Sequence, residues 1–263
     1  MRLYLAVARL AFRRVLTYKS GVAAGMFTNS VFGFIRAYVL LALWAQKPGI
    51  GGYDASDAVT YVFLAQAMMT PLGLFLGTTE LGPRVRTGDV GVDLYRPCDF
   101  QSYWFALDMG RAAGQIALRS VPMLLIPSFF FTLSLPTAPL PWVQFAISAL
   151  LALVISFAIR YLVSVSAFWT MDERGMASAL LVVSLFCSGF IIPITIMPAW
   201  LGTLCNALPW SATVQLPTNI LLGVNPAGFA DALTRQLVWA LGLLALGRLA
   251  TSAARHKVVV QGG

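Results

Sequence analysis

The sequence predicts an all-α integral membrane protein with six transmembrane helices, an N-terminal amphipathic helix and an extracellular re-entrant or interfacial segment. Composition is the first reason: 59% of the 263 residues are hydrophobic and the mean hydropathy is +0.79, whereas an ordinary soluble domain is about 45 to 50% apolar. The second reason is that apolar runs of about 20 residues recur, and each can cross a hydrocarbon core of about 30 Å as a helix. In lipid such helices satisfy their own backbone hydrogen bonds, which open sheets cannot do.

Six apolar stretches are predicted to cross the membrane, at residues 20–45, 58–78, 103–133, 142–169, 176–197 and 231–251. The third stretch is unusually long and contains Pro122 and Pro127. Each proline removes a backbone donor and tends to kink a helix, so we expect part of this stretch to bend or protrude. Because there is no internal repeat and no low-complexity linker, residues 1–263 are predicted to form a single transmembrane domain.

Residues 1–19 are predicted to form an amphipathic helix on the cytoplasmic surface. One helical face carries Arg2, Arg9 and Arg13. The residues of another face are Tyr4, Ala8, Ala11, Val15 and Tyr18. A cleavable signal peptide is the alternative, because an Arg-Arg pair precedes an apolar run. Arginines within the early apolar part, and the five further spans, favour the amphipathic helix.

Residues 198–230 are predicted to lie in, or dip into, the outer leaflet. No Asp, Glu, Lys or Arg occurs from Gly175 to Ala230, but prolines divide the later part of this region into pieces too short to span. Trp200 and Trp210 would lie at headgroup depth. A wholly extracellular cap is the alternative.

Lys and Arg are unequally distributed among the predicted loops. The side that holds both termini carries Arg2, Arg9, Arg13, Arg14, Lys19, Arg84, Arg86, Arg96, Arg174, Arg255 and Lys257. The opposite side offers Lys47, with Arg235 just inside the last span. By the positive-inside rule, both termini and the loops at 79–102 and 170–175 are expected to be cytoplasmic. Orientation in a membrane therefore explains the net charge of +8 better than nucleic-acid binding does.

The sequence shows no recognisable catalytic or metal site. It has no GxxxxGK[ST] phosphate loop, no HExxH, no GxSxG and no dinucleotide-binding fingerprint. Its three cysteines, Cys98, Cys187 and Cys205, form no CxxC motif, and His256 is its one histidine. The chain is thus predicted not to be an enzyme, so the energy for any transport must come from an ion gradient or another subunit.

The acidic residues are predicted to lie in loops or near span ends, which disfavours a carboxylate relay for ions. Two of them stand at helical spacing from an arginine, Asp108 with Arg111 and Asp231 with Arg235. We expect each of these pairs to neutralise itself locally.

Arg36 and Arg160 fall deep within the first and fourth predicted spans. An arginine at the centre of a bilayer costs about 2.5 to 3.5 kcal/mol on insertion scales. The two side chains would either contact backbone carbonyls, as structural elements of tilted helices, or line a translocation path and contact anionic lipid or substrate.

The segment RVRTGDVGVDLYRPCDF at 84–100 concentrates charge in an otherwise apolar chain. Three arginines are balanced by three aspartates, and the segment has room for one short helix flanked by turns. A neutral, polar and partly apolar surface suits protein docking better than binding of anionic headgroups. A solvated loop that follows the positive-inside rule is the alternative. The candidate partner-binding residues are Arg84, Arg86, Gly88, Asp89, Leu94, Tyr95, Arg96 and Pro97.

The stretch RTGDVGVDLYRP at 86–97 resembles the loop after the second span in permease subunits of ABC-2 type transporters, in the subgroup close to daunorubicin-resistance-type exporters. Further stretches resemble the same subunits in the same order: LW at 43–44 with IGGYDASDAVTY at 50–61, SAFWTMDERG at 166–175, SGFIIPITIMPAWL at 188–201 and LPWSATVQLPTNILLG at 208–223. The resemblance covers nearly the whole chain. Cys98 departs from it, because the family more often has a small aliphatic residue there.

The resemblance implies a six-span permease subunit of an ATP-driven exporter in a bacterial inner membrane. It would pair with a second copy or a paralogue and be driven by separate nucleotide-binding ATPase subunits, which would bind ATP and Mg²⁺, so that no cofactor is expected in this chain. The loop at 79–102 would provide a coupling helix seated in a groove of the ATPase. The residues at the positions of the family's motif are Arg86, Gly88, Asp89, Leu94, Arg96 and Pro97.

Under this interpretation an amphipathic or hydrophobic substrate would move outward by alternating access. Two functions of other classes stay open at the level of the sequence: an ion-driven secondary transporter that acts without an ATPase, and a membrane scaffold that transports nothing. Membrane lipids are expected partners in each case, and nucleic acid is not.

Overall fold

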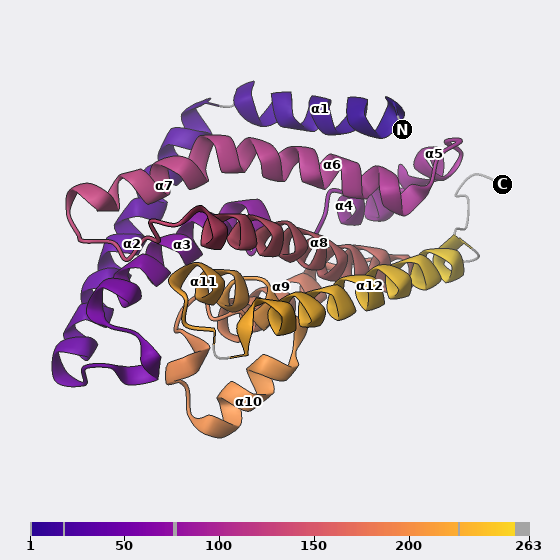
Figure 1. The fold of residues 1–263 in the computed structure, drawn as a ribbon. Helices are drawn as coiled ribbons and strands as arrows, with labels where there is room; N and C mark the ends of the chain where they lie inside the picture. The colour runs from indigo at the N-terminus through magenta and orange to yellow at the C-terminus, as the bar shows by residue number, and fades with distance from the viewer. Residues whose placement is uncertain (1, 18, 76–77, 226, 256–263) are drawn as a thin grey trace.

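The computed structural model describes residues 2–17, 19–75, 78–225 and 227–255, and these residues form helices and turns without a strand (Figure 1). The α-helices, in chain order, are α1 (Arg2–Thr17), α2 (Lys19–Gln46), α3 (Ala55–Leu72), α4 (Leu81–Thr87), α5 (Val90–Leu94), α6 (Phe100–Gln115), α7 (Val121–Leu125), α8 (Pro139–Thr170), α9 (Arg174–Cys187), α10 (Ala199–Ala207), α11 (Gln215–Leu222) and α12 (Gly228–Arg255). Shorter helical turns connect them: η1 (Ile50–Gly52), η2 (Ile116–Ser120), η3 (Pro127–Phe129), η4 (Ile194–Ile196) and η5 (Pro209–Ala212).

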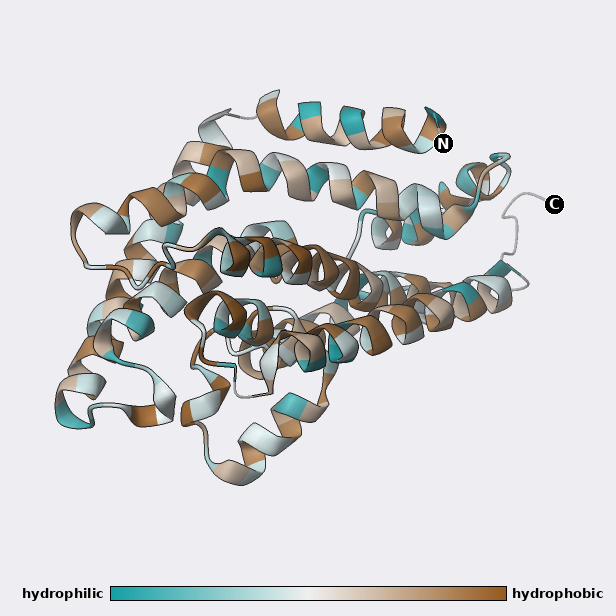
Figure 2. Ribbon diagram, viewed as in Figure 1, coloured by the Kyte–Doolittle hydropathy of each residue, from teal (hydrophilic) through white to brown (hydrophobic). Residues whose placement is uncertain are grey.

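Among the described helices, three are long and apolar enough to cross a membrane: Ser20–Gln46 within α2, then α8 and α12. Figure 2 shows hydrophobic residues along most of α8 and α12. The other three predicted spans coincide with α3, with α6 to α7, and with α9, which are shorter. The prediction of an all-helical membrane protein is confirmed, whereas six crossings stay a prediction from the sequence.

The third predicted span bends at η2, a π-helical turn between α6 and α7. Pro122 has no N–H to donate to the carbonyl of Leu118, four residues earlier, so the regular α-helical pattern is interrupted. The N–H of Val121 bonds instead to the carbonyl of Ile116, five residues earlier. Helix α7 ends at Leu125, and Pro127, which has no backbone N–H to donate, begins the 3-10 turn η3.

Helix α8 lies at the centre of the bundle and packs against α12, α11, α4 and α3. A buried hydrogen bond of 2.9 Å between the Ser148 hydroxyl and the Gln236 side-chain oxygen joins α8 to α12. Gln236 also donates to the carbonyl oxygen of Ala212, at 2.8 Å. Because such buried polar groups are costly without partners, these bonds fix how the helices pair.

Helix α11 is buried within the bundle, where it packs against α8 and α3. Its first residue, Gln215, accepts a hydrogen bond of 2.7 Å from the Tyr61 hydroxyl and donates one of 2.8 Å to the Tyr53 hydroxyl. Trp200 on α10 is 71% exposed. The segment at 198–230 therefore has a peripheral part, α10, and an inserted part, α11.

Helix α1 lies along α6 (Figure 1). Gly110 and Gly114 of α6 have GxxxG spacing, which allows two helical backbones to approach closely. A Cβ atom at Gly110 would collide with the carbonyl oxygen of Ala8, and one at Gly114 would lie 2.9 Å from Cβ of Val15. The apolar face predicted for this helix thus packs on protein; Tyr18, assigned to the same face, lies outside the described residues.

Replacing Gly110 with alanine is expected to displace α1 from α6, because the added Cβ meets backbone that has no room to move. Overpacking of this kind costs about 1 to 3 kcal/mol. The measurement is limited proteolysis of α1 in the purified, detergent-solubilised protein, where we expect faster cleavage. Gly242→Ala on α12 is the matched control, because a Cβ there meets open space. Equal cleavage rates in the two variants would show that the α1 contact does not depend on Gly110.

Candidate functional site

Residues 79–102 fold into two short helices, α4 and α5, where the sequence predicts one (Figure 1). Gly88 separates them with a φ of 83°, a conformation that favours glycine. The inward apolar residues of the two helices join a cluster with residues of α6, α8 and α12; they are Leu81, Val85, Val90 and Leu94. The two helices are therefore anchored to the bundle.

A single buried carboxylate, Asp93, joins α4 to the end of α5. It receives Nε of Arg84 at 2.5 Å and a guanidinium nitrogen of Arg96 at 3.2 Å. The hydrogen bond to Asp93 raises the pKa of the Arg84 guanidinium. Asp89 accepts from a neighbouring hydroxyl at 2.9 Å, and Asp99 caps the first turn of α6 at 2.8 Å. The arginines and aspartates of this segment are thus not paired one to one.

The outward surface of α4 and α5 mixes charged groups with exposed apolar ones. Val92 is 65% exposed and Tyr95 is 84% exposed. Together with these two residues, the α4–α5 surface comprises Arg86, Thr87, Gly88, Asp89, Arg96 and Pro97, all exposed. Arg84 and Leu94, predicted as partner-binding residues, are partly buried and support this surface from below. The sequence prediction did not include Val92.

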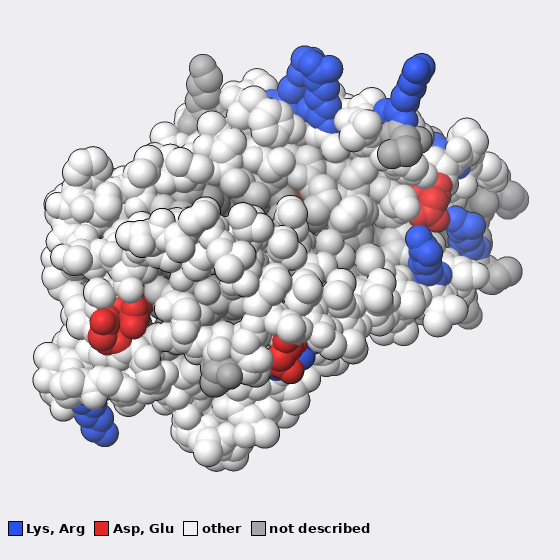
Figure 3. All heavy atoms as spheres, viewed as in Figure 1, with Lys and Arg blue, Asp and Glu red and all other residues white. Residues whose placement is uncertain are grey.

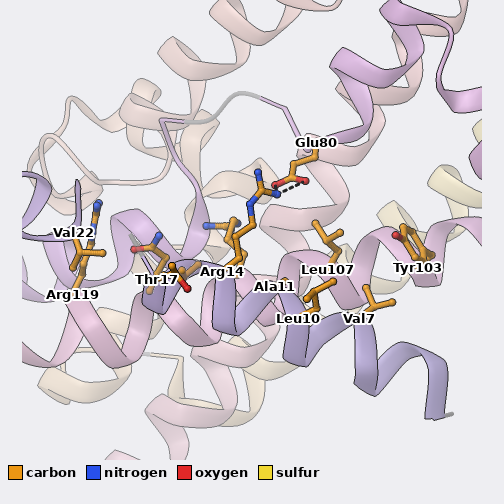
Figure 4. Close-up of a pocket in the computed structure, with 13 residues that line it drawn as sticks. Val7, Leu10, Ala11, Arg14, Thr17, Val22, Glu80, Tyr103, Leu107 and Arg119 are labelled. Atoms are coloured by element: carbon orange, nitrogen blue, oxygen red, sulfur yellow. Dashed lines mark hydrogen bonds and ion pairs between the residues drawn. The ribbon is translucent and has the colours of Figure 1, made fainter. Parts of the chain in front are cut away.

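Two contacts tie the start of this segment to other helices. Arg14 of α1 forms an ion pair with Glu80, just before α4, at 3.0 Å (Figure 4). The backbone N–H of Thr79 donates to the Ser164 hydroxyl of α8 at 2.9 Å. A displacement of α4 would therefore be transmitted to α1 and α8.

Asp108, in the middle of α6, is buried with two arginines. Arg160 of α8 approaches it at 2.6 Å, and Arg111 at 2.9 Å. Arg111 also donates to the carbonyl oxygens of Thr70, at 3.0 Å, and Pro71, at 2.8 Å, in the last turn of α3. The local pair of Asp108 with Arg111 is as the sequence predicts. The second partner, Arg160, comes from another helix 52 residues away.

Arg36 of α2 has no carboxylate partner among the described residues. It donates to the carbonyl oxygens of Phe190 and of Ile191, the latter at 3.2 Å. Its guanidinium carbon lies 4.5 Å from the centroid of the Phe190 ring. Two of its nitrogens, Nε and Nη1, are buried without a hydrogen-bond partner in the described part of the chain. Arg36 therefore contacts backbone carbonyls and retains two unused donors.

Two cavities lie beside α6. The first, of about 700 Å³, lies between α1 and α6, with Leu10 and Leu107 among its apolar residues (Figure 4). The second, of about 710 Å³, is bordered by α2, α3 and the chain around Phe190. Three residues at helical spacing of four line both cavities: Arg111, Gln115 and Arg119. The two cavities thus share one polar wall.

Figure 3 shows where charge lies on one face of the molecule. Lys and Arg gather over α1 and at the end where α5 and the last part of α12 lie, and most of the remaining face is uncharged. Segments that the sequence assigns to one side of the membrane are therefore close together in space.

A family model described as ABC-2 family transporter protein matches residues 31–262. The chain belongs to the ABC-2 transporter family. This ABC-2 protein is thus a multi-pass membrane protein and a permease component of an ABC transporter, a class that associates with ATP-binding subunits. No curated protein and no solved structure matches it.

Two features of the ABC-2 permease differ from what the sequence predicts. Asp108, which the sequence places near a span end, is buried in the middle of α6 and has a second arginine, Arg160, as a partner. Arg235 forms no ion pair with Asp231 among the described residues; it donates instead to the carbonyl oxygen of Asn206 at 2.5 Å. That pairing was wrong because a nearby carbonyl on α10 competes for the arginine. The GxxxG spacing at 110–114 was a signal in the sequence for the α1 contact, and it was missed.

Asp108→Asn is expected to lower the thermal unfolding midpoint of the ABC-2 permease in detergent, because it leaves the buried Arg160 and the partly buried Arg111 without an anion. Breaking a buried ion pair costs about 3 to 5 kcal/mol. The control is Asp172→Asn, which removes an exposed pair with Arg174, and exposed pairs contribute little. A midpoint for Asp108→Asn as high as that of the control would show that Asp108 does not hold the bundle together.

Proposed function

We propose that this permease is the transmembrane subunit of an ATP-driven exporter of the daunorubicin-resistance type, and that its ATPase subunits dock on the α4–α5 surface. The observation that carries the proposal is an exposed surface held in a fixed shape. Asp93 bridges Arg84 and Arg96 below it, while Val92 and Tyr95 project from it. An aromatic residue surrounded by polar groups is a common centre of a protein interface.

The α4–α5 surface and both termini belong, in this proposal, to the cytoplasmic side of a bacterial inner membrane that the chain crosses six times. The unequal distribution of Lys and Arg supports this orientation. The grouping of basic residues over α1 and near α5 and the end of α12 supports it as well (Figure 3).

ATP and Mg²⁺ would bind to the ATPase subunits, and closure of those subunits would push on the α4–α5 surface. This force would be transmitted to α1 through the ion pair of Arg14 with Glu80. It would be transmitted to α8 through the hydrogen bond from Thr79 to Ser164. Movement of the bundle against a second copy or a paralogue would then expose the path outward, for an amphipathic or hydrophobic substrate. The chain itself contributes binding surfaces and mechanics, and the catalysis belongs to its partner.

Tyr95→Ala is expected to weaken binding of the ATPase by about 2 kcal/mol, the loss typical of an aromatic residue at the centre of an interface. Arg86→Glu is expected to weaken it further by reversing a charge in the same surface. The measurements are copurification with the cognate ATPase and ATP hydrolysis by the reconstituted complex.

Both substitutions are at exposed positions, so the bundle should remain folded. Lys47→Glu, an exposed charge reversal in the loop between α2 and α3, is the matched control and should leave both measurements unchanged. If Tyr95→Ala and Arg86→Glu copurify and hydrolyse ATP like the control, the ATPase does not dock on the α4–α5 surface.

A further inference from the structure

The cavity bordered by α2, α3 and α6, here called the arginine cavity, has three cations in its wall. Its lining includes Arg36, Arg111 and Arg119, and it includes no Asp or Glu. Arg111 shares the charge of Asp108 with Arg160 and donates to two carbonyls of α3. Arg36 and Arg119 form no ion pair within the described part of the chain. The cavity therefore carries a positive charge that the protein does not balance.

The two unbalanced arginines also have unused hydrogen-bond donors. Nε and Nη1 of Arg36 and Nε of Arg119 are buried and lack partners among the described residues. Arg119 is held in place by a bond of 2.8 Å to the carbonyl oxygen of Gly21. A Cβ at Gly25 would lie 2.7 Å from its guanidinium, so the glycine leaves the room that this side chain needs. Buried donors on a charged group are costly unless a ligand accepts from them.

Much of the remaining wall of the arginine cavity is apolar, and its uncharged polar residues are Thr28, Asn29, Gln66, Thr70 and Gln115. Its large apolar residues are Phe32, Met69, Phe75, Leu185, Phe190 and Ile191. Phe32 is 58% exposed and Phe75 is 54% exposed. Phe32 belongs to α2, a helix long and apolar enough to cross the membrane, so an apolar tail can leave the cavity along it toward lipid.

The two arginines lie at different levels of α2. Arg119 contacts Gly21 and Gly25, whereas Arg36 is 11 positions after Gly25, which corresponds to about 16 Å along a helix. An anionic headgroup can therefore bind at either end of the cavity, at Arg119 or at Arg36. Phe32 lies between these two levels on α2, where it can pack against the apolar chain of a bound molecule.

We propose that the arginine cavity binds an anionic amphiphile, a molecule with a phosphate or carboxylate headgroup and an apolar tail. Arginine matches such headgroups because its fork of donors can bind two oxygens at once. Since no carboxylate lines the cavity, a headgroup that also carries a cation finds no opposite charge for that cation. The binding of this amphiphile does not depend on the proposed function. The further claim that it is the transported substrate does rest on the proposed function.

The test measures binding to the purified full chain without an ATPase, so that it is independent of transport. The probes are lysophosphatidylglycerol, lysophosphatidylcholine with the same acyl chain, and glycerol 3-phosphate, which has a phosphate but no tail. We expect lysophosphatidylglycerol to bind at least about tenfold more tightly than either of the others. Lysophosphatidylcholine carries a choline cation that arginines repel, and glycerol 3-phosphate has no tail to bury against the apolar wall.

The double variant Arg36→Gln with Arg119→Gln is expected to lower the affinity for lysophosphatidylglycerol about tenfold, and Arg36→Lys with Arg119→Gln is expected to retain part of that affinity. Phe32→Ala, at an exposed position that should not affect folding, is expected to weaken binding of both lysolipids. Arg9→Gln, an exposed arginine on α1 outside this cavity, is the control and should bind like the unmodified chain.

Equal binding of the two lysolipids, or unchanged binding in the double glutamine variant, would overturn the proposal. Binding of glycerol 3-phosphate as tight as that of lysophosphatidylglycerol would also overturn it, because the ligand would then be a free anion. Loss of ATPase docking with normal lysolipid binding would contradict the proposed function alone.

Discussion

The buried carboxylate of Asp108 is the interaction on which the arrangement of the central helices depends. It is the one anion between Arg111 on its own helix and Arg160 on α8. Arg160 is buried and Arg111 is partly buried, and an uncompensated charge is costly away from water. Because Arg111 also binds the last carbonyls of α3, one carboxylate fixes the relative positions of three helices.

The end of α3 connects the cluster of Asp108, Arg111 and Arg160 with the segment that leads to the α4–α5 surface. The Ser156 hydroxyl of α8 donates to the carbonyl oxygen of Leu72, the last residue of α3. A few residues later Thr79 bonds to Ser164, two turns further along the same helix. The chain between the two points is thus pinned to α8 at both ends. In the proposed exporter, force applied to α4 would act on α8 and on the wall of the arginine cavity together.

Much of the fold could be predicted because it follows from local patterns. The apolar stretches predicted the long helices, and the separate charged and apolar faces of residues 1–19 predicted α1. Pro122 and Pro127 gave the bend between α6 and α7. The crowding of charge at 84–100 indicated a surface with a role of its own, and the family resemblance there was confirmed by the match over residues 31–262.

The remainder depends on contacts between residues far apart in sequence, which periodicity cannot reveal. The sequence pattern paired Asp108 with Arg111, its neighbour at helical spacing, and left Arg160 without a partner. Asp108 and Arg160 are 52 residues apart in the sequence, and only the packing of α6 against α8 brings them together. It also placed Leu94 on the docking surface, while the structure turns that side chain toward the core. Arg119 was not a candidate, because only the fold brings it into the lining of the cavity that Arg36 also lines.

The most direct measurement of whether force enters at the α4–α5 surface is site-specific photocrosslinking in the complex with the cognate ATPase. A photoreactive phenylalanine analogue in place of Tyr95 should crosslink to the ATPase on illumination. The same analogue in place of Trp200, an exposed aromatic residue on α10, should not. Crosslinking from position 200 and none from position 95 would contradict the proposed site of coupling.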